Sequence, residues 1–324
     1  MKSIILFLSL ISLSSATSFW SLDEGREILL ERLGPLTSEE SEEITTAVTP
    51  EVLPEEKELP ESWKGNEAQE SFSTARRLLE REVFGSSNST IYCGCEYVVV
   101  EGKTMVDFST CGFFPKDGTW NDRDRRVEWE HVLPASHFGK FAGEMKDAWE
   151  NGHVLCETSS GKTYKGRRCA EKVSREFRLM QADMHNLWPA MGSVNGLRSD
   201  RQIAEISGET PTFGTCDAEF EFGIFEPRDV VRGEMARTYL YMEWAYGGYY
   251  QIPDELRPML TRWVQSDPVS PEECRKESRI AEIQGNSNPF VRSHCEGMVL
   301  ESSESSDPVS APDMVGVEQE TSEK

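Results

Sequence analysis

The residue types best suited to chemistry lie in the segment Arg-Val-Glu-Trp-Glu-His-Val-Leu-Pro-Ala, in which Glu130 and His131 are adjacent. A histidine suits the role of general base, because its ordinary pKa near ~6.5 leaves the ring largely neutral at neutral pH. A glutamate suits a hard cation such as Mg²⁺, which prefers oxygen ligands. Neighbouring strand residues point to opposite faces, so the two share one site only where the backbone is irregular, as Pro134 allows. An acidic residue beside a histidine more often has a purely structural role.

A second polar group follows further along the chain. Asn195 and Arg198 are three residues apart, which places them on the same flank of a helix. The amide oxygen of Asn195 can complete a magnesium site that faces Glu130. His185 and Asn186, just before this helix, are better interpreted as polar groups that hold the loop.

A basic run, Lys162–Arg178, holds seven basic and two acidic residues. Such a run is usually a solvated face, but beside a metal and a histidine it can grip phosphates. Arg167 or Arg168 can donate two parallel hydrogen bonds to a scissile phosphate. The sequence does not decide between these two arginines.

The elements that must position these residues are several helices and one short antiparallel sheet. Apolar and polar residues alternate in Arg126–Leu133, which predicts a strand. Pro189 ends one helix or starts the next. The fold class expected from these patterns is α+β. The other expected elements are a helix over 73–84 behind a serine cap, a hairpin over 91–108, a helix capped by Ser174, a helix through 191–197, and helices over 229–246, 253–264 and 271–283.

The N-terminus has the features of a secretory signal peptide. Lys2 precedes the apolar run Ile4–Leu13, which is too short to span a bilayer, and small residues follow up to Ala16. Export implies an oxidising compartment, in which we expect every cysteine to be bridged. Four bridges allow 105 pairings, and the sequence cannot choose among them. The eight cysteines are residues 93, 95, 111, 156, 169, 216, 274 and 295.

The acidic balance of the whole chain, a formal net charge of −23, is concentrated near its ends. Ser21–Glu70 holds 15 acidic and 4 basic residues, and Glu296–Lys324 holds 8 acidic and 1 basic residue. The body between them is only moderately charged, so the global charge does not exclude a nucleic-acid partner. We expect a signal peptide (1–16), a largely disordered acidic linker or propeptide (17–70), one folded domain (71–295) and an acidic disordered tail (296–324).

Four motifs resemble the bacterial endonuclease I family of secreted or periplasmic nonspecific nucleases. They are Glu-Trp-Glu-His-Val-Leu-Pro-Ala, Phe-Arg-Leu-Met-Gln-Ala-Asp-Met-His-Asn-Leu, Val-Asn-Gly-Leu-Arg-Ser and Arg-Ile-Ala-Glu-Ile-Gln-Gly-Asn-Ser-Asn-Pro-Phe. The likeness covers roughly Ser73–Cys295 in the same motif order and includes Tyr-Cys-Gly-Cys and all eight cysteines.

The resemblance implies a disulfide-bonded ββα-metal (His-Me finger) nuclease core with surrounding helices. It places the general base on His131, the magnesium ligands on Glu130 and Asn195, and the phosphate-binding arginine on Arg167. It further implies a secreted or periplasmic, monomeric enzyme with Mg²⁺ as cofactor and no membrane contact after signal cleavage. Its substrates are expected to be DNA and RNA, cut with little sequence preference to leave 5′ phosphates.

Two features depart from the family, and two other functions stay open. The segment Phe138–Arg167 is longer than usual, and the acidic arms have no counterpart in the family. One alternative is a secreted nucleic-acid-binding module without catalysis, against which the complete set of site residues argues. The other is a zinc hydrolase that uses His131, His137 and His153, although these lack the spacing of a zinc motif.

Overall fold

The computed structural model describes residues 58–85, 87–100, 102–208 and 210–295. The chain divides into two units, residues 1–57 and 58–324, and only the second contains described residues. The expected signal peptide, the acidic tail and most of the acidic linker lie outside the described residues and stay predictions. None of the described helices combines the length and the apolar character that a membrane span requires.

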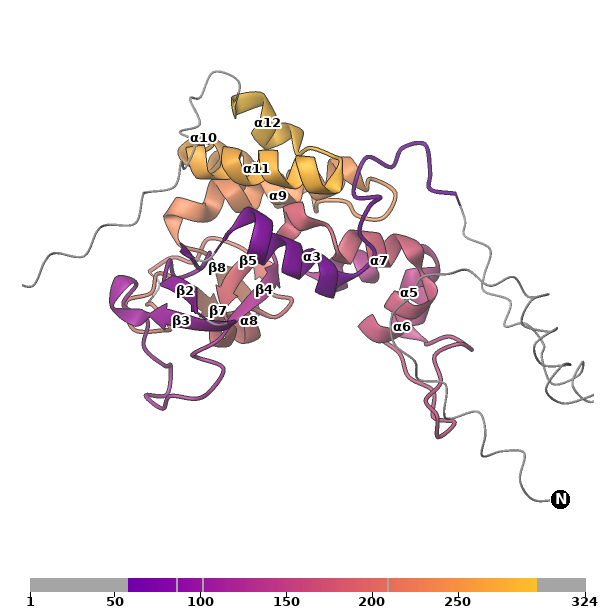
Figure 1. Ribbon diagram of the computed structural model, residues 1–324, viewed down its shortest axis with the longest axis horizontal. Coiled ribbons are helices and arrows are strands. Elements are labelled where there is room, and N and C mark those ends of the chain that lie inside the picture. The colour runs from indigo at the N-terminus through magenta and orange to yellow at the C-terminus, as the bar shows by residue number, and fades with distance from the viewer. Residues whose placement is uncertain (1–57, 86, 101, 209, 296–324) are drawn as a thin grey trace, which may run out of the picture. The chain divides into compact units, whose positions relative to one another are not determined.

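The strands form three separate sheets, so the prediction of one sheet is wrong (Figure 1). In the first, β2 pairs antiparallel with β1 and β3, and in the second, β4 pairs antiparallel with β5. In the third, β8 lies between a parallel β6 and an antiparallel β7. Four of these strands have only two or three residues, too few for a readable alternation of apolar and polar side chains. The bounds are β1 Ser87–Ser89, β2 Glu96–Val100, β3 Lys103–Asp107, β4 Val127–His131, β5 Leu187–Met191, β6 Gln202–Ile203, β7 Glu219–Glu221 and β8 Ile224–Glu226.

The strand β5 corrects the prediction that Pro189 ends or starts a helix. Its five residues pair with β4, and Pro189 lies opposite Trp129. All five are buried, so the segment lacks the alternation by which a half-exposed strand is recognised. Because β5 has only one neighbouring strand, it can accommodate a residue without a backbone N–H. The helix that follows begins only at Gly192.

The helices agree more closely with the sequence. Ser71 and Ser174 accept hydrogen bonds from the backbone N–H groups of Thr74 and Phe177, which confirms both as caps. The long C-terminal helices lie together on one side of the described unit, and α8 packs against both β4 and β5 (Figure 1). The bounds are α3 Phe72–Leu78, continued by a π-helical turn Leu79–Val83, α4 Ala135–Gly139, α5 Gly143–Glu150, α6 Arg167–Val173, α7 Arg175–Gln181, α8 Gly192–Arg198, α9 Arg232–Ala245, α10 Arg257–Ser266, α11 Pro271–Gln284 and α12 Pro289–Cys295.

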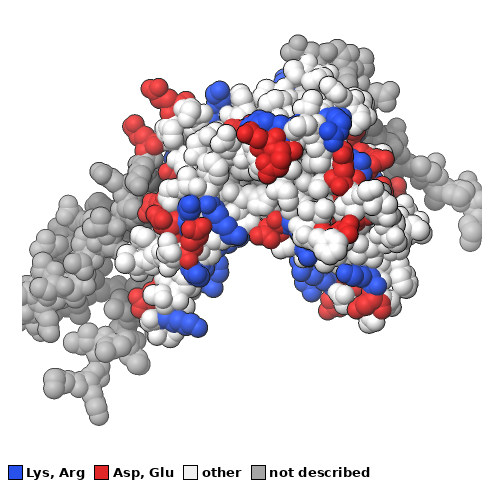
Figure 2. Space-filling model, turned by 180° about the vertical axis from the view of Figure 1, so that it is seen from behind, with Lys and Arg blue, Asp and Glu red and all other residues white. Residues whose placement is uncertain are grey.

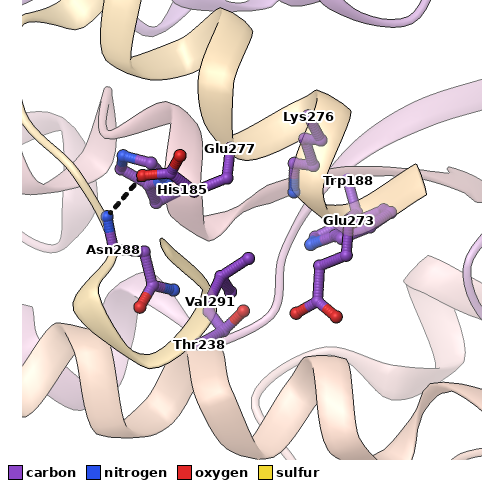
Figure 3. A pocket seen from close by; sticks show the side chains of 8 residues that line it. All are labelled: His185, Trp188, Thr238, Glu273, Lys276, Glu277, Asn288 and Val291. Carbon is purple, nitrogen blue, oxygen red and sulfur yellow. Dashed lines mark hydrogen bonds between the residues drawn. The ribbon is translucent and has the colours of Figure 1, made fainter. Parts of the chain in front are cut away.

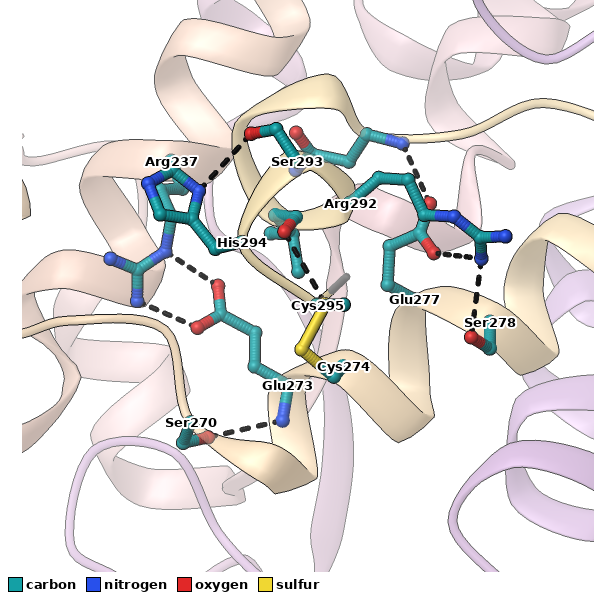
Figure 4. Close-up of a disulfide and its surroundings, with 12 residues drawn as sticks. Arg237, Ser270, Glu273, Cys274, Glu277, Ser278, Arg292, Ser293, His294 and Cys295 are labelled. Carbon is teal, nitrogen blue, oxygen red and sulfur yellow. Dashed lines mark hydrogen bonds and ion pairs between the residues drawn. A yellow bond between two sulfur atoms is a disulfide. The ribbon is translucent and has the colours of Figure 1, made fainter. Parts of the chain in front are cut away.

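All eight cysteines are bridged, as predicted. One bridge spans a sequence separation of 123 residues, and the other three close loops of 13 to 21 residues. Bridges of this kind stabilise a fold mainly by restricting the unfolded chain. The last bridge fixes α12 to α11, beside a buried ion pair (Figure 4). The pairs are Cys93–Cys216, Cys95–Cys111, Cys156–Cys169 and Cys274–Cys295.

Residues 58–70, which the sequence analysis assigns to the acidic linker, contribute to the packed core. Trp63 is buried with its ring edge-on to Tyr246, at 4.6 Å between centroids. The side chain of Asn66 is fully buried and donates a hydrogen bond of 2.8 Å to the backbone oxygen of Leu179. The packed structure therefore begins before residue 71.

Candidate active site

His131 is the last residue of β4, opposite Leu187 of β5 in a regular antiparallel register. The irregular backbone expected near this residue begins only after the strand ends. The ring is buried, stacks on Phe72 at 5.1 Å between centroids, and has its Nε2 2.8 Å from the backbone oxygen of Gln181. A carbonyl oxygen can only accept, so Nε2 carries the hydrogen and Nδ1 keeps a lone pair.

Glu130 is buried on the opposite face of β4. One of its carboxylate oxygens accepts a hydrogen bond of 2.8 Å from the Tyr92 hydroxyl and lies 3.4 Å from the Arg198 guanidinium. Arg198 is itself fully buried and donates to the backbone oxygens of His131 and Val132, at 3.3 and 2.6 Å. No role for Arg198 or Tyr92 was predicted from the sequence, although both lie inside motifs of the family resemblance.

The protonation of both residues reflects their burial. Burial and the nearby charge of Arg167 lower the pKa of His131 to about 3, so the ring is neutral at neutral pH. Burial raises the pKa of Glu130 to about 7, although the charge of Arg198 and the hydrogen bond from Tyr92 act in the opposite direction.

Asn195 lies on α8, which packs against β4. Its Nδ2 donates a hydrogen bond of 3.1 Å to Glu128, and Arg123 donates two more to the same carboxylate, at 3.0 and 2.8 Å. Residues two apart in a strand share a face, so Asn195 lies on the face of β4 that also carries Glu130. No described residue donates to the Asn195 Oδ1. A carboxylate and a free amide oxygen on one face suit a hard cation, although no contact joins Asn195 to Glu130.

Arg167 is the first residue of α6 and lies at the His131 side of the site. Its Nε donates a hydrogen bond of 3.1 Å to the Gln181 side chain, and its guanidinium lies 5.3 Å from the centre of the Phe72 ring. Burial lowers its pKa, while the charges of nearby carboxylates, Glu130 among them, raise it. Arg168 instead packs over the Tyr164 ring, at 5.1 Å. Only Arg167 is therefore close to His131 among these two arginines.

The sequence model of the family described as Endonuclease I matches residues 74–295, which is more than half of the chain. The chain belongs to the endonuclease I family. An extracellular deoxyribonuclease of Aeromonas hydrophila is 34% identical over 70% of this chain and 90% of its own length. A periplasmic deoxyribonuclease of the same organism is 35% identical over 66% of this chain and 83% of its own. An Endonuclease-1 of Buchnera aphidicola is 31% identical over 70% of this chain and 82% of its own.

The basic run of this endonuclease I member is partly neutralised within the fold. Arg175 and Arg178 each donate to the carboxylate of Glu70, at 2.9 and 2.8 Å. Lys165 donates to the backbone oxygen of Glu150 at the end of α5, and Lys172 donates to that of Leu155. The described unit is nevertheless hollowed on one side, and lysine and arginine side chains gather on both flanks of this hollow (Figure 2). Such flanks suit the two sides of a phosphate backbone.

The zinc hypothesis has no cluster to support it in the described residues. No three histidine, cysteine, aspartate or glutamate side chains of that part come together in a way that could hold a metal ion. His137 lies 3.1 Å from the backbone oxygen of Asp200, and His153 lies 3.9 Å from Glu144. Neither of these two contacts involves His131.

A small cavity is lined by Trp188 of β5, Lys276 of α11 and His185 (Figure 3). The Lys276 ammonium is 3.3 Å from the centre of the Trp188 ring, and burial lowers its pKa to about 7.

The ring Nε2 of His185 lies 3.1 Å from the backbone oxygen of Asn286. The side-chain amide of Asn186 accepts a hydrogen bond from the backbone N–H of Leu133 and donates one to its backbone oxygen. Both His185 and Asn186 thus have the loop-holding contacts that the sequence indicated.

Proposed function

We propose that this chain is a secreted or periplasmic, magnesium-dependent endonuclease that hydrolyses DNA and RNA with little sequence preference. The observation that carries the proposal is a neutral histidine with a fixed tautomer, His131, which lies near the charge of Arg167 and follows the buried Glu130 in β4, in a chain of the endonuclease I family. The antiparallel β4 and β5 followed by α8 fit a ββα-metal core. Its acid–base and phosphate-binding groups would lie at the end of β4.

Glu130 and the Oδ1 of Asn195 would hold the magnesium ion. A bound divalent cation stabilises the charge that develops on phosphate and leaving oxygens during hydrolysis. The desolvation of the Glu130 carboxylate supports this assignment, because a buried anion is relieved by a cation. Arg198 and Tyr92 hold that carboxylate in place.

His131 would remove the proton from the attacking water through Nδ1. Its other nitrogen is held by Gln181, so the ring cannot turn away without losing that hydrogen bond. Water attacks the phosphorus in line with the 3′ oxygen, which leaves, so the 5′ phosphate stays on the downstream fragment. Arg167 balances the extra negative charge of the pentacovalent transition state.

The substrate range follows from this chemistry. The nucleophile is water, so the reaction needs no 2′ hydroxyl, and DNA and RNA are both accepted. Lysine and arginine on the flanks of the hollow bind phosphates, which carry no base information. The names of the relatives, extracellular and periplasmic deoxyribonucleases, support DNA as a substrate and export of the chain. We expect one chain to suffice for activity.

End-group analysis of the products tests the proposal. Linear DNA and RNA are incubated with the protein and Mg²⁺, and the fragments are examined by mass spectrometry. We expect 5′ phosphates and 3′ hydroxyls from both substrates. RNA fragments with 2′,3′-cyclic phosphates would contradict the proposal, because they require attack by the 2′ hydroxyl. Tight binding without any cleavage would favour the noncatalytic binding module.

A further inference from the structure

Gln181, the last residue of α7, joins the two groups to which the proposed reaction assigns proton transfer and charge balance. Its backbone oxygen accepts the hydrogen bond from His131 Nε2, at 2.8 Å. Its side-chain Oε1 accepts the hydrogen bond from Arg167 Nε, at 3.1 Å. The residue is 1% exposed, so water does not compete for either contact.

The other end of the Gln181 amide is unpartnered. Its Nε2 is buried and has no hydrogen-bond partner in the described part of the chain. Exchanging the oxygen and the nitrogen does not remove the problem, because the Nε of Arg167 can only donate and would then face a second donor. A buried donor without a partner lowers the stability of a fold, so a residue without that donor would be more favourable here.

Gln284 provides a comparison within the same fold, since it is also buried, at 4% exposed. Its Oε1 accepts from the backbone N–H of Met184 at 2.8 Å, and its Nε2 donates to Asp183 at 2.8 Å. Both ends of that amide therefore stabilise the structure. Gln181 differs in two ways. Its hydrogen bonds go to Arg167 and His131, and its Nε2 has no hydrogen-bond partner in the described part of the chain.

We propose that Gln181 is a positioning residue that holds Arg167 and His131 in their working arrangement, an inference that rests on the proposed function. The contact to Nε fixes the plane of the guanidinium. Neither terminal nitrogen of Arg167 has a hydrogen bond to a described residue, so their four N–H groups stay available for a phosphate. A planar guanidinium held at Nε is preorganised for such a bidentate contact.

The substitution Gln181→Met tests the side-chain contact, because it keeps the volume and the backbone carbonyl but removes both polar atoms. With supercoiled DNA at saturating Mg²⁺, we expect kcat to fall roughly 10- to 100-fold, the usual effect of misplacing a transition-state group, with KM changed about twofold or less. Gln181→Glu keeps an oxygen that accepts from Arg167, so its kcat should stay within about threefold of the parent value. Gln181→Met should not lower the melting temperature, because it also removes the buried donor.

Gln284→Met is the matched control. It should lower the melting temperature, because it breaks hydrogen bonds at both ends of a buried amide, while kcat of the folded protein stays near the parent value. The inference is supported if Gln181→Met lowers kcat but not the melting temperature, and Gln284→Met lowers the melting temperature but not kcat.

A double-mutant cycle with Arg167→Ala separates the inference from the proposed function. If Gln181 acts through Arg167, then Gln181→Met should change kcat little once Arg167 is removed. An equal fold loss in both backgrounds would overturn the positioning role and leave the proposed function intact. If Arg167→Ala alone leaves kcat unchanged, the role of Arg167 in the proposed function fails, and the inference fails with it.

Discussion

Replacing Glu273 by glutamine should destabilise the protein strongly, because it breaks a fully buried ion pair. Glu273 accepts two hydrogen bonds from Arg237, at 2.7 and 2.6 Å, beside the Cys274–Cys295 bridge (Figure 4). The two residues are 4% and 1% exposed, so the arginine would keep its charge out of water with only neutral acceptors left, the backbone oxygen of Asp267 and the new amide. Removing one partner of such a pair costs about 3–5 kcal/mol in free energy of unfolding.

The expected loss is large enough to measure directly. At roughly 2–4 °C per kcal/mol for a chain of this size, the melting temperature should fall by about 10 °C. Urea unfolding without reductant, followed by tryptophan fluorescence, gives the free energy while the bridges stay intact. Glu282→Gln on the same helix is the control, since Glu282 pairs with Arg279 at the surface and should cost less than about 1 kcal/mol.

The double change Arg237→Met with Glu273→Met completes this test. It removes both charges, so it should cost less than the single change Glu273→Gln. The argument would be refuted if Glu273→Gln lost no more stability than Glu282→Gln. A double variant less stable than the single one would point to packing, rather than an uncompensated charge, as the source of the loss.

Three further predictions concern function. His131→Ala should lower turnover by about 10²–10⁴-fold while DNA binding persists, and a near-normal rate would remove His131 from the role of base. Glu130→Ala and Asn195→Ala should each raise the magnesium concentration required for activity, and independent, additive losses in the double variant would contradict a shared ion. Residues 17–57 hold 11 acidic and 3 basic residues, so a chain shortened to 58–295 should bind DNA more tightly at low salt. That advantage should shrink near 0.1 M salt, where the Debye length is about 10 Å, and equal affinities throughout would leave the acidic arms only a solubility role.

The sequence predicted elements that have a clear period or a clear cap. The strand β4 and the serine-capped helix α7 follow this rule, because alternation and capping are local properties of neighbouring residues. The strand β5 does not, because its five residues are buried on both faces and include Pro189. A uniformly apolar segment of that length has no periodicity that separates strand from helix.

The candidate site was predictable in its residue types but not in its contacts. The adjacent Glu130 and His131 and the amide of Asn195 indicated acid–base and metal chemistry, and the family resemblance favoured Arg167 over Arg168. The partners that fix them are distant in sequence: Tyr92 bonds a residue 38 positions away, and Gln181 holds one 50 positions away. Only tertiary structure brings such pairs together. The choice between two consecutive arginines likewise depended on where α6 begins.

The supporting role of Arg198 shows the same limit. The sequence placed it on the same helical flank as Asn195 and assigned it no partner. In the fold it is fully buried and bonds Glu130 and the end of β4. From sequence alone, a charged residue on a helix is expected to face solvent, because its buried partner cannot be identified.

Nicking of supercoiled plasmid DNA by the purified protein tests the central claim most directly. The rate is measured with Mg²⁺, with excess chelator, and after Mg²⁺ is added back to the chelated sample. A magnesium-dependent endonuclease nicks the plasmid with Mg²⁺, stops with chelator and recovers when the ion returns. Equal nicking with and without chelator, or no nicking under any of these conditions, would contradict the proposed reaction at Glu130 and His131.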